Sequence, residues 1–115
     1  MADFRTFELE ALRLLAGEEL PASLLDRMFA AEVPLKYQYT GCGYFLTLSH
    51  PDLPAERAVL SHPIVTAHFG STIVSFLAFL GEHELILECC SFGSDEIPPD
   101  FRDQPIEVFA EESLQ

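Results

Sequence analysis

Three side chains have the types and settings that could support chemistry: Glu88, His68 and Cys42. Cys42 lies between two glycines, where a thiol is accessible and could act as a nucleophile beside a suitable base. Glu88 interrupts an apolar segment, and burial there would raise the pKa of its carboxyl group and suit it to acid or base catalysis. A small enzyme or ligand-binding domain would place these three residues in a pocket between a sheet and residues 94–105.

Each candidate also has a plainer interpretation. A cysteine in a glycine turn usually has no chemical role, and histidines without a metal-ligand motif are more often exposed loop residues than ligands. Glu88 could lie where its face of the sheet opens to solvent, or it could pair with Arg102, Arg57 or Tyr37. Whether Glu88 is buried therefore separates the two interpretations.

The usual catalytic and metal-binding motifs are missing from the sequence. The four histidines include no H-x-x-x-H spacing, and the three cysteines include no C-x-x-C spacing. There is no glycine-rich phosphate loop, and neither Ser71 nor Ser91 has a G-x-S-x-G context. We therefore expect no metal and no cofactor. An odd number of cysteines, with Cys89 and Cys90 adjacent, is typical of free thiols in a reducing compartment.

The net charge of the chain limits the kinds of macromolecule that it can attract as a binding partner. Nineteen acidic residues against six basic residues give a net charge of −13. Such a chain repels nucleic acid and anionic membrane surfaces, whereas it attracts a basic protein. The alternative is that the charge only keeps the protein soluble. No apolar run approaches the ~20 residues of a membrane helix and no signal-peptide core is evident, so we expect a cytoplasmic protein.

The most apolar segment, Ser71–Gly93, predicts the centre of a β-sheet. It reads as strands Thr72–Leu80 and Leu85–Phe92, joined by a tight turn at Gly81–Glu84. This turn pairs Leu80 with Leu85 and, farther along, Leu77 with Glu88. Both faces of the hairpin are apolar, so each needs a cover. Helices can cover one face, and a loop, a further layer or a second subunit can cover the other.

The rest of the chain predicts a single α+β domain over residues 1–115. Apolar spacing indicates a helix over Phe4–Ala16 and a second helix that begins at Glu18, so residues 1–31 should form a helical hairpin on one face of the sheet. Residues 32–110 should form a mainly antiparallel sheet of about six strands. Its other strands are expected at Val33–Thr40, Tyr44–Ser49, Ile64–Phe69 and Ile106–Phe109, with residues 50–63 as a proline-containing connection.

The turn Thr40-Gly41-Cys42-Gly43-Tyr44-Phe45 resembles a TGxGFF-like turn found in a group of small, acidic, functionally uncharacterised bacterial proteins. Tyr44 takes the place of the first Phe. The segment from Ile73 to Pro99 is similar to the same group in its order of strand, Gly-containing turn, strand, aromatic-Gly and acidic proline-containing stretch. The resemblance covers about residues 38–100. It implies the fold and an accessory or immunity-type protein, and it carries over no catalytic residue.

Charge and the missing motifs together favour a non-enzymatic acidic binding module that docks a basic protein. Loop carboxylates would make the contact, with aromatic side chains as anchors. The residues predicted for this interface are Asp95, Glu96, Asp100, Asp103, Tyr37, Tyr39 and Phe101. A homodimer through the second apolar sheet face is the remaining alternative.

Overall fold

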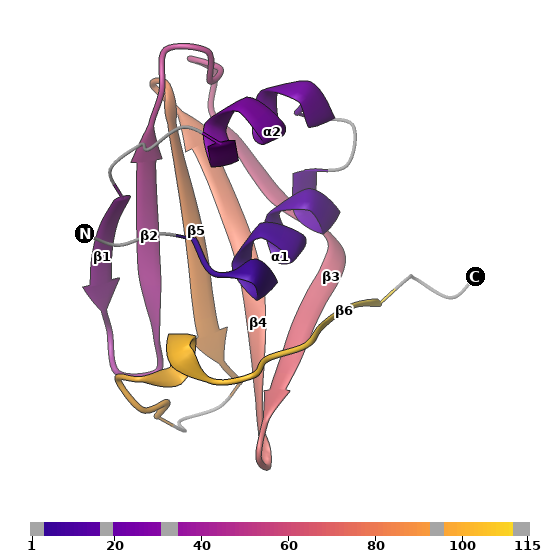
Figure 1. The fold of residues 1–115 in the computed structure, drawn as a ribbon, viewed down its shortest axis with the longest axis vertical. Coiled ribbons are helices and arrows are strands. Elements are labelled where there is room, and N and C mark those ends of the chain that lie inside the picture. The colour runs from indigo at the N-terminus through magenta and orange to yellow at the C-terminus, as the bar shows by residue number, and fades with distance from the viewer. Residues whose placement is uncertain (1–3, 17–19, 31–34, 93–95, 112–115) are drawn as a thin grey trace.

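The computed structural model describes residues 4–16, 20–30, 35–92 and 96–111. It is an α+β fold built on one six-stranded antiparallel sheet, with strand order β1-β2-β5-β4-β3-β6. Helices α1 (Thr6–Ala16) and α2 (Ala22–Ala30) lie on the same side of this sheet (Figure 1). A short 3₁₀ turn, η1 (Phe101–Asp103), lies in the segment that leads to the last strand.

The predicted central hairpin is confirmed as β4 (Thr72–Gly81) and β5 (Glu84–Ser91). Its register is the expected one, with Leu80 opposite Leu85 and Leu77 opposite Glu88. Glu82 and His83 both have positive φ, as the two central residues of a type I′ hairpin turn require. Because neither is glycine, this turn needs support. Hydrogen bonds from the Glu82 and His83 amides to carbonyls at residues 55 and 54, each 3.0 Å long, supply it.

The outer strands lie close to the expected segments, although residues 33 and 34 of the first expected strand lie outside the described residues and the last strand begins at Val108 instead of Ile106. β1 (Leu35–Tyr39) and β2 (Gly43–Ser49) form the expected hairpin, and β6 (Val108–Glu111) pairs with β3. However, β3 spans Ala58–Phe69, so residues 58–63 are strand and the prediction of a connection there was wrong. The register against β4 shifts between Leu60 and Val65, and this irregularity lets the strand continue through Pro63.

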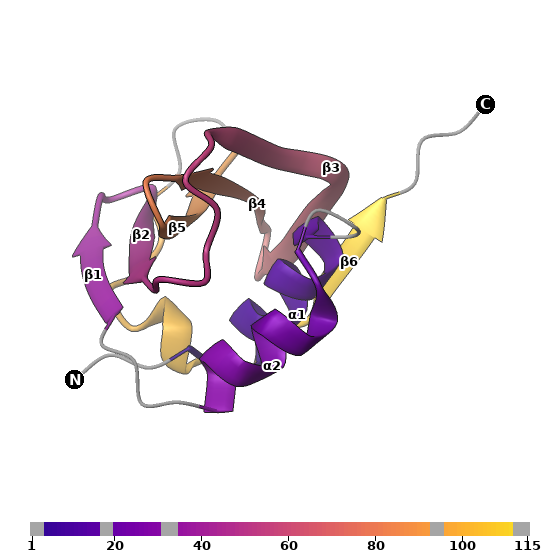
Figure 2. The same ribbon diagram turned by 90° about the horizontal axis from the view of Figure 1, so that it is seen from above.

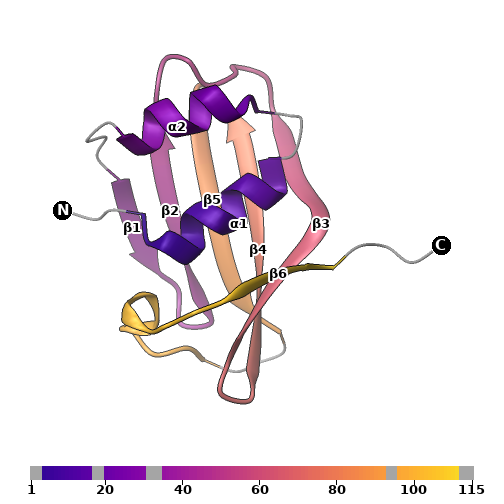
Figure 3. The same ribbon diagram turned by 45° about the vertical axis from the view of Figure 1, so that its right-hand side comes forward.

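The sheet curls around the helices, as Figure 2 shows, so it has an inner face and an outer face. On the inner face α1 crosses the sheet and contacts β3, β4 and β6 (Figure 3). The buried residues include Leu12 and Leu15 of α1 with Phe76 of β4 and Leu87 of β5. This face therefore holds the hydrophobic core, and the helices leave the outer face uncovered.

The predicted helical hairpin is not confirmed. Both α1 and α2 are present, but residues 17–19, which would form the turn between them, lie outside the described residues. Nine residues make α2 short, and Leu24 and Leu25 are its described buried side chains. In the part of the chain that the structure covers, no helix combines the length and apolarity needed to span a membrane.

Candidate functional site

The outer face of the sheet is a largely apolar surface over which no helix or strand of the described residues packs. Side chains alternate along each strand, so the residues between the core positions of β2, β4 and β5 all point outward. The half-buried apolar residues on this face are Phe45, Leu77, Phe79, Ile86 and Cys90, and the more exposed ones are Val59 and Ile73. Val59 is 59% exposed, far more than a core strand residue. Thr47 and Ser75 lie among these residues on the same face. A largely apolar exposed surface is a common mark of an interaction site.

Glu88 lies in the middle of this outer face. It is opposite Phe45 of β2 on one side and Leu77 of β4 on the other. Its side chain is half-buried, so it is neither deep in the core nor fully in solvent. Arg102, one of the partners considered from the sequence, pairs with Glu8 on the inner side of the sheet instead. Glu88 is therefore a carboxylate surrounded by apolar neighbours, whereas Glu84 lies on the same face nearer the turn.

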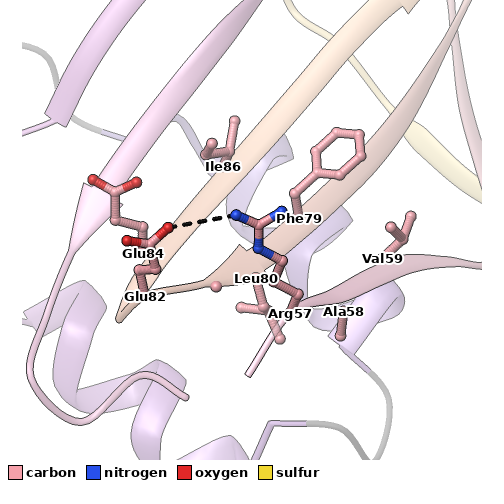
Figure 4. A pocket seen from close by; sticks show the side chains of 9 residues that line it. Arg57, Ala58, Val59, Phe79, Leu80, Glu82, Glu84 and Ile86 are labelled. Carbon is pink, nitrogen blue, oxygen red and sulfur yellow. Dashed lines mark ion pairs between the residues drawn. The ribbon is translucent and has the colours of Figure 1, made fainter. Parts of the chain in front are cut away.

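A pocket of about 410 Å³ opens at one end of the outer face, beside the 81–84 turn (Figure 4). Val59, Phe79 and Ile86 provide its apolar lining. Glu82 and Glu84 stand at its rim, where Glu82 forms an exposed ion pair with Arg57 at 3.7 Å. The size and apolar lining of this pocket fit an apolar side chain that protrudes from a binding partner. The carboxylates at its rim favour a cationic side chain beside it.

Several of the residues that the sequence predicts for an interface lie near one another at the β1 edge of the sheet. Tyr37 and Tyr39 lie in edge strand β1, and the Tyr39 hydroxyl donates a 2.5 Å hydrogen bond to the Ile97 carbonyl oxygen. This contact brings the exposed carboxylates Glu96 and Asp100 into the same region as the two tyrosines.

Three of the residues predicted for that interface are buried, already paired or outside the described residues. Phe101 is only 1% exposed, because it packs against Phe7, Tyr44 and Phe69. It is therefore a core residue and the prediction of an exposed anchor was wrong. Asp103 is exposed but forms an ion pair with Arg5 at 3.0 Å. Asp95 lies outside the described residues.

The structure does not bring Glu88, His68 and Cys42 together as a catalytic group. His68 is exposed on β3 opposite Ile73 of β4, whereas Glu88 on β5 lies opposite Leu77, four residues farther along β4, so the two side chains are apart both across and along the sheet. Residues 97–103 pack on the inner side, through the buried Ile97 and Phe101, whereas Glu88 points outward. His68 instead lines a pocket of about 300 Å³ with Pro105, Glu107 and Phe109. Among the described residues, no three His, Cys, Asp or Glu side chains form a group that could hold a metal ion.

A buried ionic network between Glu8, Arg102 and Tyr44 was not predicted from the sequence. The Arg102 guanidinium donates hydrogen bonds of 2.6 and 2.8 Å to the two carboxylate oxygens of Glu8. The Tyr44 hydroxyl donates to the same carboxylate at 2.6 Å, and the Arg5 amide donates to it at 2.7 Å. Glu8 is 0% exposed. This network joins α1, β2 and η1, and it therefore supports the fold rather than a reaction.

Burial and the hydrogen bonds of this network shift the pKa values of the side chains that form it. Burial opposes the charge of Arg102, but the hydrogen bonds and negative charge of Glu8 outweigh it and raise the Arg102 pKa. Burial raises the pKa of Tyr44 far above its ordinary value of 10.0, and the nearby Cys89 and Glu8 add to the shift. Burial likewise raises the pKa of Cys89 above 9.0.

These shifts predict that the protein loses stability in alkali. A raised pKa in the folded state means that the unfolded chain releases protons first, so stability is complete below the ordinary pKa values and falls as pH rises beyond about 9 to 10. Tyr44 alone should contribute a slope of about 1.4 kcal/mol per pH unit above pH 10. Urea unfolding between pH 8 and 11 measures this slope, and Tyr44→Phe should reduce it. An unchanged slope in Tyr44→Phe would contradict the assignment.

The three cysteines occupy two different environments. Cys89 faces the core and is 1% exposed. Cys42 and Cys90 are both partly exposed, and their Sγ atoms lie 2.8 Å apart. Burial, followed by the contact with Cys42, raises the pKa of Cys90 to about 11. Cys42 has no partner close to it in the sequence, and only the fold brings Cys90 to it.

Comparisons with protein-family models, with curated proteins and with solved structures find no match to this chain. Function therefore has to be inferred from the surfaces described above.

Proposed function

We propose that this chain is a non-enzymatic acidic binding module, of the accessory or immunity type, that docks a basic protein on the outer face of its sheet. The observation that carries the proposal is the uncovered apolar face with Glu88 at its centre. In this proposal residues 1–31 form a helical hairpin that supports the sheet from inside, and the protein works in the cytoplasm.

The charge of the chain decides the chemistry of the partner. With a net charge of −13, the protein attracts a basic surface over long range and speeds its encounter. At the face itself, a lysine or arginine of the partner would pair with Glu88, and an apolar side chain would enter the pocket lined by Phe79 and Ile86. A carboxylate within an apolar ring gains more from such a cation than an exposed carboxylate does, because water is excluded around it.

The outer face is a better docking surface than the loop carboxylates predicted from the sequence. At the loop, Asp103 already pairs with Arg5, and Phe101 is buried. Asp100 accepts a 3.2 Å hydrogen bond from the side chain of Gln104. Tyr37, Tyr39 and Glu96 remain exposed there and form a second, more polar contact area.

A second copy of the chain fits this face less well than a basic partner. In a two-fold symmetric dimer built on the centre of the face, the two Glu88 carboxylates would approach each other, and each subunit brings thirteen net negative charges. We therefore expect a monomer, and light scattering at micromolar concentration tests this. If the protein is instead a dimer, and Glu88→Lys dissociates it, the outer face would be assigned to self-association.

The function is tested by capture from source cells with three versions of the protein. Wild type should retain a basic protein at low salt and lose it as ionic strength rises. Glu88→Lys reverses the central charge, and Phe79→Ala removes part of the pocket lining, so each should weaken binding of the purified partner at least tenfold.

Glu10→Lys is the matched control, because it makes the same change of charge on an exposed position of α1, behind the sheet. It should lower the association rate only slightly. The proposal fails if the captured protein is not basic, or if Glu10→Lys weakens binding as much as Glu88→Lys does.

A further inference from the structure

We propose that Cys42 and Cys90 form a redox-active dithiol that a peroxide converts into an intramolecular disulfide. The two sulfur atoms lie 2.8 Å apart, closer than non-bonded sulfur atoms normally approach. A disulfide bond is about 2.04 Å long, so only a small movement separates the pair from bonding. Cys90 lies on the outer face proposed for docking, but the inference does not rest on docking and its test needs no partner.

The fold holds the two thiols together. Cys42 directly precedes β2, and Gly43 at the start of β2 pairs with Cys90 of β5. The Ser91 amide also donates a 2.8 Å hydrogen bond to the Cys42 carbonyl oxygen, which fixes the turn against the end of β5. Because backbone pairing sets this arrangement, the approach of the two thiols is built into the sheet and does not depend on loop motion.

Solvent exposure distinguishes Cys42 and Cys90 from the third cysteine, Cys89. Cys42 and Cys90 are partly exposed, so a small oxidant reaches them, whereas Cys89 is 1% exposed on the opposite face. Adjacent strand residues point to opposite faces, so Cys89 cannot replace Cys90 as the partner of Cys42. The chain therefore carries one oxidisable pair and one protected thiol.

The chemistry balances with hydrogen peroxide as the oxidant. The Cys42 thiolate attacks one peroxide oxygen, which breaks the O–O bond, gives a sulfenic acid and releases hydroxide that takes up the thiol proton as water. The Cys90 sulfur then attacks the sulfenic sulfur, forms the S–S bond and releases a second water. Two thiols are oxidised and one peroxide is reduced to two waters. A dithiol reductant reverses the change by exchange.

Oxidation should also stabilise the fold. The bond would close a loop between residues 42 and 90, 48 positions apart, and a cross-link over such a loop restricts the unfolded chain. We expect the oxidised protein to melt about 10 °C higher than the reduced protein.

The test treats purified reduced protein with hydrogen peroxide and follows free thiols, intact mass and a non-reducing peptide map. The expected result is a fall from three free thiols to one, a loss of two hydrogen atoms and a peptide linking Cys42 to Cys90. Dithiothreitol should reverse each change. Cys89→Ala should still form the bond, whereas Cys42→Ser and Cys90→Ser should not.

Three outcomes would overturn the proposal. These are three thiols that survive the treatment, a bond that involves Cys89, and oxygen addition at Cys42 without any cross-link. Because single-cysteine variants keep the surface charges, circular dichroism can establish that each is folded before its thiols are scored.

Discussion

Replacement of Arg102 by alanine should destabilise the protein by about 3–5 kcal/mol, since it leaves the Glu8 carboxylate buried and without its cation. Glu8→Ala should cost a similar amount, because it leaves the Arg102 guanidinium buried. Such losses are a large part of the stability of a domain of this size, so we expect either variant to be partly unfolded at room temperature. Urea unfolding monitored by circular dichroism measures the change.

The matched control is the exposed ion pair between Arg13 and Asp26, whose atoms lie 2.7 Å apart. Although this distance is as short as those in the buried network, solvent screens the pair, so Asp26→Ala should cost at most about 1 kcal/mol. The double variant Glu8→Leu with Arg102→Leu should be more stable than either single alanine variant, because no unpaired charge remains. Equal costs for the buried and exposed pairs would contradict the role assigned to the network.

Gly43→Ala should be the most damaging change at a glycine, with a cost of roughly 3 kcal/mol or more. A Cβ atom at residue 43 would lie 1.6 Å from the Cys89 carbonyl oxygen and 2.8 Å from the Cys90 Cα. Both are backbone atoms of β5, so the clash cannot be relieved by a side-chain rotation. β2 would have to separate from β5 at this end. Thermal unfolding of the variant measures the effect.

Gly70→Ala is the control for Gly43→Ala. Gly70 has a φ of +62°, which disfavours alanine, but an added Cβ would meet nothing within 4 Å. The expected cost is therefore only the backbone term of about 1–2 kcal/mol. If Gly70→Ala proved the more harmful of the two, close strand approach would not be the reason that residue 43 is glycine.

Local patterns in the sequence account for the centre of the fold. Both faces of the 72–92 hairpin are apolar, so the tight turn at Glu82 and His83 fixes the β4–β5 register, because it decides which residues of the two strands lie opposite each other. Pro63 was misleading, since proline normally ends a strand, and only a register shift in β3 accommodates it. That shift depends on neighbouring strands and leaves no local signal.

The buried network was predictable in part. Glu8 lies four positions before Leu12 and seven before Leu15, so helical spacing places it on the apolar face of α1. A carboxylate at such a position needs a buried cation. The identity of that cation was not predictable, because Arg102 lies 94 positions away and only the tertiary fold joins them. The same holds for Cys42 and Cys90, whose contact depends on the β2–β5 register.

The distance in sequence between Glu8 and Arg102 also affects biosynthesis. A growing polypeptide carries the Glu8 carboxylate long before the ribosome has added its guanidinium partner. Burial of that carboxylate alone is unfavourable, so α1 should dock onto the sheet only after residue 102 has emerged. Until then the inner face of the β4–β5 hairpin, which is complete at Ser91, has no docked α1 to cover it and is open to chaperones.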